Sequence, residues 1–291
     1  MLDKLKNRYK EAFTSTYHPN SSDYRWFQTE QNEIFGIHRS FLTDEEEKLL
    51  SALFQPYPID QQKGNRSKWF HFIFEQKPLE ETIRNVRFYY FFTNQKIEEK
   101  DIFKEAFQGI IHSFSIVWLS DQHGWLIHEN DKEPVSSEAL AQTAETVGAD
   151  FMTDIAIFIG QLHRVNAKLP RLIQNEIALI ELYKNIFDGG NKAFTFSELL
   201  ILQFIHKKQK IHPKEFLSDY ILEAFQDGEL MKTIKVFIES NLNVTKTAKK
   251  LFMHRNSVQY RIDKFIEWTG IDVRQFCDAV AVYLLIRLYE H

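Results

Sequence analysis

Residues 241–265 read NLNVTKTAKKLFMHRNSVQYRIDKF, and this stretch decides the fold of the C-terminal part of the chain. Thr245 is expected to cap a short helix at 246–252, a turn follows at 253–255, and a longer helix is predicted at 256–268. One face of the longer helix is apolar at helical spacing, through Val258, Ile262, Phe265 and Ile266. Two short helices joined by about three residues form a helix-turn-helix arrangement.

The segment around this stretch is helical and basic. Residues 230–240 predict a helix before it, and residues 278–289 predict a last helix after it. Residues 230–291 contain ten Lys or Arg and six Asp or Glu, a net charge of +4, whereas the whole chain carries −4. An acidic body with a basic helix-turn-helix end is the pattern expected of a double-stranded-DNA-binding module on a regulatory region.

The outward side chains of the two helices are of the types that contact DNA. Arg, Asn and Gln pair with base edges, whereas lysines on the preceding helix contact phosphates without reading sequence. Alternatively, the segment is a structural bundle with a solvated basic face, Tyr260 packs against the domain, and His254 only caps its helix. The candidate DNA-binding residues are Thr245, Lys246, Lys249, Lys250, His254, Arg255, Asn256, Ser257, Gln259, Tyr260, Arg261 and Lys264.

Residues 241–265, followed by Thr269-Gly270, closely resemble the C-terminal helix-turn-helix of PucR/CdaR-family bacterial transcriptional regulators. The motif that carries the resemblance is His-Arg-Asn-Ser-Val-Gln-Tyr-Arg at 254–261. Ser257 stands where the family more often has Thr, so the hydroxyl is kept and the methyl is lost. The resemblance covers about 60 residues and implies a sequence-specific DNA-binding transcriptional regulator.

Residues 84–160 alternate between strand and helix patterns. Strands are expected at 86–93, 115–119, 125–128 and 153–160, and helices at 96–112 and 136–147, with Gly148 after the second helix. Residues 120–124 join the middle two strands as a hairpin. This order makes a β-α-β-β-α-β α/β sandwich if one more strand is present. The fold class is therefore α+β, a sandwich followed by an all-helical helix-turn-helix domain.

The sandwich is similar to the GGDEF-like domain that these regulators place before the DNA-binding module. Active diguanylate cyclases carry Gly-Gly-(Asp/Glu)-Glu-Phe in the hairpin, whereas residues 120–124 read Ser-Asp-Gln-His-Gly. The first strand also lacks a metal-binding Asp, so carboxylates for magnesium are missing. The resemblance thus implies a degenerate, non-catalytic domain. A nucleotidyl cyclase-like enzyme with a helical tail is the alternative function, and a scaffold without a DNA role is a third.

The remaining segments are less informative. Residues 41–53 predict a helix capped by Thr43 and Glu46, with an apolar stripe of Leu49, Leu50, Leu53 and Phe54. Residues 69–74 predict a strand, and 169–187 and 196–206 predict helices. The expected domains are 1–80 of unknown role, 81–190 as the GGDEF-like sensor or dimerisation domain, 191–228 as a helical connector, and 229–291 as the DNA-binding domain.

Composition limits the other chemistry. Cys277 is the single cysteine, so neither a disulfide framework nor a multi-cysteine zinc site fits within one chain. The 11 histidines lack partners at metal-ligand spacing, so we expect no metal and no cofactor. No signal peptide or membrane span is recognisable, which favours a cytoplasmic protein. A homodimer is expected, with candidate interfaces at 169–187 and 278–289, as is response to a small-molecule effector.

Overall fold

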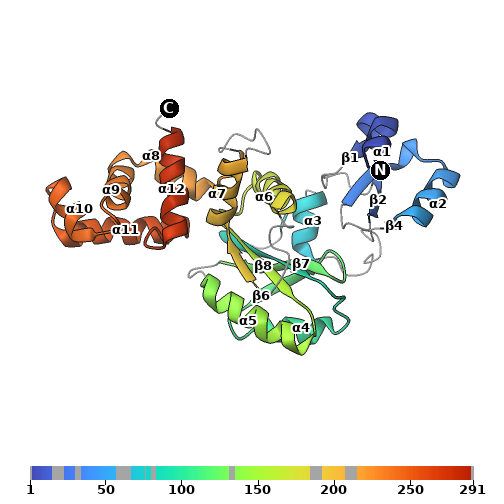
Figure 1. Cartoon of the computed structure of the whole chain (residues 1–291), viewed down its shortest axis with the longest axis horizontal. Helices are drawn as coiled ribbons and strands as arrows, with labels where there is room; N and C mark the ends of the chain where they lie inside the picture. The colour runs from blue at the N-terminus through green and yellow to red at the C-terminus, as the bar shows by residue number, and fades with distance from the viewer. Residues whose placement is uncertain are drawn as a thin grey trace. The chain divides into compact units, whose positions relative to one another are not determined.

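The computed structural model describes residues 2–14, 23–29, 34–56, 67–75, 77–79, 83–130, 135–183, 192–206 and 215–289. The chain forms two compact units, residues 1–82 with 117–124 and residues 83–116 with 125–291. Figure 1 labels most of the helices and strands of both. Within the described ranges, no helix combines the length and the apolar character needed to cross a membrane. The finer division into four domains stays a prediction.

The first unit is built on a four-stranded antiparallel sheet with the strand order β1-β3-β2-β4. Phe27 and Phe35 of this sheet pack with Leu50 and Phe54 in a buried core. The elements are α1 (Leu2–Tyr9), β1 (Phe13–Thr14), β2 (Tyr24–Gln28), β3 (Ile34–His38), α2 (Asp44–Leu53), β4 (Gln55–Pro56) and α3 (Lys68–Glu75), with 3-10 turns at Lys10–Ala12 and Arg39–Phe41.

Helix α2 begins as predicted, because Thr43 N donates to Glu46 Oε2 at 3.1 Å and Glu46 N donates to Thr43 Oγ1 at 3.2 Å. The predicted apolar stripe is only partly buried, since Leu49 and Leu53 are 60% and 57% exposed. The predicted strand at 69–74 is wrong, and these residues lie in helix α3. Their buried members are Trp69, Phe70, Ile73 and Phe74, which share one helical face, whereas the loose alternation of the sequence predicts a strand.

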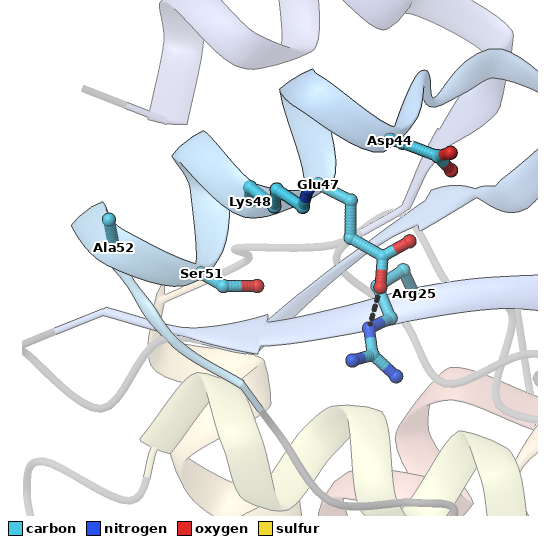
Figure 2. Close-up of a pocket in the computed structure, with 6 residues that line it drawn as sticks. All are labelled: Arg25, Asp44, Glu47, Lys48, Ser51 and Ala52. Carbon is cyan, nitrogen blue, oxygen red and sulfur yellow. Dashed lines mark ion pairs between the residues drawn. The ribbon is translucent and has the colours of Figure 1, made fainter.

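A hollow of about 620 Å³ lies beside α2 in the first unit. Its lining consists of Arg25, Asp44, Glu47, Lys48, Ser51 and Ala52. Figure 2 shows Glu47 of α2 directed at Arg25 of β2, with Glu47 Oε1 at 2.7 Å from Arg25 Nε. The hollow therefore presents both signs of charge.

The second unit contains a five-stranded sheet with the order β6-β7-β5-β8-β9. The predicted β-α-β-β-α-β order is confirmed, and the additional strand, β9, pairs in parallel with β8. Figure 1 shows α4 and α5 together on one side of this sheet. The elements are β5 (Asn85–Thr93), α4 (Lys100–Phe107), β6 (Phe114–Trp118), β7 (His123–Glu129), α5 (Ser137–Asp150), β8 (Ile155–Arg164) and β9 (Lys192–Thr195).

Several boundaries in the sandwich differ from the prediction. Helix α4 covers only eight residues of 96–112, and Ile102, expected on its apolar side, is 53% exposed. Gly148 lies buried inside α5 rather than after its end. Strand β8 extends four residues beyond Gly160, because its continuation pairs with the start of β5. The predicted hairpin is present, and Leu119 N and Ser120 N both donate to His123 O.

The remaining described elements of the second unit are helices, which confirms the α+β class. Helix α12 packs against α7 and α9. Residues 184–187 of the predicted 169–187 helix lie outside the described residues. The helices are α6 (Leu169–Tyr183), α7 (Phe196–His206), α8 (Asp219–Gln226), α9 (Gly228–Glu239), α10 (Val244–Leu251), α11 (Arg255–Thr269) and α12 (Phe276–Tyr289).

Glu176 of α6 is fully buried and is the centre of a polar network in the sandwich. Its carboxylate accepts hydrogen bonds from Tyr90 Oη at 2.9 Å, Gln161 N at 3.0 Å and Gln161 Nε2 at 2.7 Å, and lies 3.1 Å from Nε2 of the buried His163. Burial alone would raise the pKa of Glu176, but the neighbouring His163 and the hydrogen bonds from Gln161 lower it below its ordinary value. Gly160 leaves the space for this carboxylate, since a Cβ there would lie 2.9 Å from Glu176 Oε2.

The same region joins the sheet to the helices that follow. Gln161 Nε2 donates to Phe216 O at 2.7 Å, and Gln161 Oε1 accepts from Ser218 N, the residue that caps α8, at 2.8 Å. Arg164 at the end of β8 binds both carboxylate oxygens of Glu223 in α8, at 2.6 and 3.0 Å. Helix α8 is therefore fixed to the sheet by buried and bidentate hydrogen bonds.

Gly270 ends α11 close to the sheet. Its φ of 71° lies in the left-handed region, which favours glycine. A Cβ at this position would lie 2.5 Å from Nη2 of the buried Arg87 of β5. Only glycine therefore fits both the backbone conformation and the close approach of Arg87.

Candidate nucleic-acid interface

Helix α10 begins two residues earlier than expected. Asn243 Oδ1 accepts from Lys246 N at 2.9 Å, so Asn243 is the capping residue and Thr245 lies exposed in the first turn. The predicted Thr245 cap is therefore wrong, because the asparagine two residues earlier already satisfies the free N–H groups. Ala248 is buried as predicted, and Thr247 beside it is also buried.

The turn between α10 and α11 is closed by backbone hydrogen bonds. Met253 N donates to Ala248 O at 2.9 Å and Phe252 N donates to Lys249 O at 3.3 Å, the pattern of a Schellman motif. His254 then caps α11, since its Nδ1 accepts from Asn256 N at 3.2 Å. His254 is therefore the capping residue of α11.

Helix α11 is held to the bundle by an apolar face. Val258, Ile262 and Phe265 are fully buried, and Ile266 is half-buried. The helix contacts α8, α9 and α10. The predicted inward face is thus confirmed, and Asn256, Ser257 and the 69%-exposed Tyr260 lie on the outer surface.

The basic residues divide into two groups. Lys246, Lys249, Lys250 and Arg255 are all exposed, and their side chains form no ion pair or hydrogen bond with the described residues. These four side chains are free to meet an anion. They come from α10 and from the first residue of α11.

Arg261 and Lys264 form the second group and are engaged within the chain. Arg261 Nη1 donates to Thr233 Oγ1 at 2.8 Å and to Glu229 O at 3.1 Å. Lys264 Nζ donates to Asp227 Oδ2 at 3.2 Å. The pKa of Asp227 lies below its ordinary value because the Leu230 N–H and then Lys264 donate to its carboxylate. These contacts attach α11 to the start of α9.

Comparison with known proteins agrees with this geometry. Residues 230–288 match the family model of the PucR C-terminal helix-turn-helix domain. The DNA-binding transcriptional activator AdeR of Bacillus subtilis is 26% identical over 143 residues, which are 46% of this chain and 33% of AdeR. The chain belongs to the PucR/CdaR family. It is a DNA-binding transcriptional regulator.

Two relatives of this PucR-family chain match over nearly its whole length. Uncharacterized protein YxkF of Bacillus subtilis is 30% identical over 267 residues, covering 89% of each chain. Leucine-rich protein of Streptococcus dysgalactiae subsp. equisimilis is 24% identical over 276 residues, covering 92% of this chain and 94% of that protein. The similarity therefore includes the sandwich and the first unit.

Gln259 of the PucR-type module has an oriented side chain. Its Nε2 donates to Asp263 Oδ1 at 3.0 Å, one helical turn further on, and Asp263 lies 3.7 Å from Arg274 Nη1. The amide oxygen of Gln259 is left to accept a hydrogen bond from outside. Sequence reasoning missed this pair, and it also missed Asn243 and the exposed Phe252 of the turn.

The hairpin at 120–124 of this regulator carries no cluster of carboxylates. Ser120 Oγ lies 2.6 Å from His123 Nδ1, so these two polar side chains pair with each other. Across the described residues there is no group of three or more His, Cys, Asp or Glu side chains suited to a metal ion. The residue Cys277 is exposed. Partial burial of its thiol, followed by the charges of Glu198 and Asp278, raises the pKa of this thiol.

Proposed function

We propose that α10 holds the DNA backbone and that the start of α11 reads the bases. Lys246, Lys249 and Lys250 supply the phosphate contacts, with Thr245 beside them. The base edges are contacted by Arg255, Asn256, Ser257, Gln259 and Tyr260. The support for this proposal is the division of the basic residues: the three lysines and Arg255 are unengaged, whereas Arg261 and Lys264 bind α9. His254, Arg261 and Lys264 accordingly position the reading helix.

The variants Gln259→Ala and Lys249→Ala distinguish base recognition from phosphate binding. We expect Gln259→Ala to lower the ratio of specific to nonspecific affinity by about tenfold, because one amide pair with a base contributes ~1–3 kcal/mol of discrimination. Lys249→Ala should weaken binding to both duplexes alike. Titrations against a selected duplex and its scrambled counterpart measure both ratios. If Lys249→Ala changed the sequence preference and Gln259→Ala did not, the assignment of α11 as the reading helix would be wrong.

The regulator acts as a homodimer on two half-sites, in our proposal. One recognition helix spans too few base pairs for specificity, and helix-turn-helix modules usually pair on half-sites one turn apart. The two interfaces expected from sequence are largely occupied within the chain, since the apolar positions of α6 and α12 are mostly buried. Leu49 and Leu53, one turn apart on α2, are exposed and offer another apolar surface. A dimer would neutralise twice as many phosphates as one module, so the salt dependence of binding reports the stoichiometry.

The degenerate sandwich has a non-catalytic role in this proposal. The hairpin at 120–124 lacks the glycine-acid signature, and strand β5 carries no carboxylate. The contacts of the sandwich with α8 support a role for the sandwich in positioning the DNA-binding helices.

The effector of the regulator is proposed to be a small polar metabolite that carries both charges and binds the hollow beside α2. The supporting observation is the lining, which combines Arg25 and Lys48 with Asp44 and Glu47. Its size lies in the ~300–1,000 Å³ range of small-molecule sites. We expect at least one free amino acid to raise the melting temperature of the full chain. The same amino acid should leave the melting temperature of the Arg25→Ala variant unchanged. A panel without any such shift would argue against this site.

A further inference from the structure

Phe252 occupies an unusual position at the end of α10. Its φ of 53° and ψ of 41° place it in the left-handed region, and its side chain is 98% exposed. Glycine, or less often asparagine, is the usual residue at this position of a Schellman motif, because a bulky side chain is strained there. The two hydrogen bonds that close the motif come from backbone atoms, so glycine would make them equally well.

Packing within the chain does not account for the phenyl ring. At 98% exposure the ring contacts almost nothing of the described chain, and it packs against no aromatic ring there. The next residue, Met253, is the one that turns inward and is half-buried. An exposed aromatic ring in a strained conformation lowers stability, so its presence points to a contact made outside the chain.

The surroundings of Phe252 indicate the chemistry of that contact. Lys249 and Lys250 precede it by three and two residues, and Arg255 follows by three; all are exposed and unengaged. A positively charged rim suits a polyanion, and DNA also offers apolar carbon at the thymine methyl and the deoxyribose. We propose that Phe252 makes an apolar contact with duplex DNA beside the lysine contacts. This inference rests on the proposed orientation of α10 and α11 on the duplex.

The chain offers a matched control in Met152. Its φ is 51°, it is 88% exposed, and it follows α5 in the same motif, with Thr153 N donating to Gly148 O at 2.9 Å. Met152 lies in the sandwich rather than in the helix-turn-helix. Met152→Gly therefore removes an exposed apolar side chain from the same strained backbone, away from the basic surface.

The test uses the full chain and a duplex that the full chain has selected from random DNA. We expect Phe252→Gly to weaken binding about tenfold with an unchanged salt slope, because an apolar contact releases no counterions. Met152→Gly should bind as the wild type does. Both variants should unfold at the same or a higher temperature, since glycine relieves the left-handed strain. Replacing thymine by deoxyuridine distinguishes the two carbon sources: the Phe252 effect disappears for a methyl contact and persists for a sugar contact.

Three results would overturn the inference. Unchanged affinity in Phe252→Gly would show that the ring does not meet DNA, and a reduced salt slope would show that the lysines had moved instead. A change in oligomeric mass without a change in intrinsic affinity would assign the ring to a second copy of the chain. If Lys249→Ala weakened binding while Phe252→Gly did not, only this inference would fail. If neither substitution weakened binding, the proposed orientation would fail as well.

Discussion

Replacing Glu176 by Ala should lower the free energy of unfolding by about 3–5 kcal/mol, because it breaks a buried pair and leaves the other partner uncompensated. Tyr90 Oη, Gln161 N and Gln161 Nε2 would lose their acceptor, and His163 Nε2 would lose its neighbour. Each buried donor without a partner costs about 1–3 kcal/mol. Urea denaturation of the full chain, monitored for the second unit, measures the loss.

Glu145→Ala is the matched control for this substitution. Glu145 lies on the exposed surface of α5 in the same sandwich, so its replacement should change stability by no more than ~0.5 kcal/mol. The two variants should also differ in pH dependence. Since the folded-state pKa of Glu176 is lowered, its contribution is present above the unfolded-state pKa and is lost as the pH falls through the folded-state value. Equal stability of both variants would contradict the assigned network.

Binding to the selected duplex should weaken about 10³-fold between 50 and 200 mM salt if two modules bind together. Three lysines on each α10 would neutralise about six phosphates, and each contributes ~0.9 to the slope of log affinity against log salt. The expected slope is then about −5, and Lys249→Ala should reduce its magnitude by about 1 for each bound module. A fluorescence titration of the full chain at several salt concentrations gives both values.

The slope also decides the stoichiometry. A single bound module would give a slope near −3 and a loss of only about 40-fold over the same range. Gln259→Ala serves as the control, because loss of an uncharged side chain should leave the slope unchanged. A flat response to salt would exclude α10 as the backbone-contacting helix.

Local patterns predicted the helix-turn-helix closely. The inward residues of α11 and the capping box of α2 follow from spacing within one or two turns, and so they could be read from sequence. The cap of α10 was misassigned because Asn243 and Thr245 are both good capping residues, and only backbone geometry distinguishes them. The strand predicted at 69–74 failed because a six-residue aromatic run fits either periodicity.

Long-range partners account for what the sequence could not indicate. Arg261 and Lys264 looked available for DNA, but Asp227 and Glu229 bind them from more than 30 residues away. Sequence spacing indicates no acidic partner for the histidines, whereas His163 contacts Glu176 because β8 and α6 pack together. Phe252 gave no signal, because its exposure depends on the path of the turn.

The two hydrogen-bond partners of the Gln161 side-chain amide have a consequence for genetic screens of this regulator. One side chain on β8 bonds both to Phe216 O and to the cap of α8, and Arg164 adds a second attachment nearby. A genetic screen for loss of repression or activation would therefore recover substitutions deep in the sandwich. They would be mixed with substitutions of residues that contact the operator. Sorting such alleles by protein abundance first would keep folding defects from being mapped as promoter contacts.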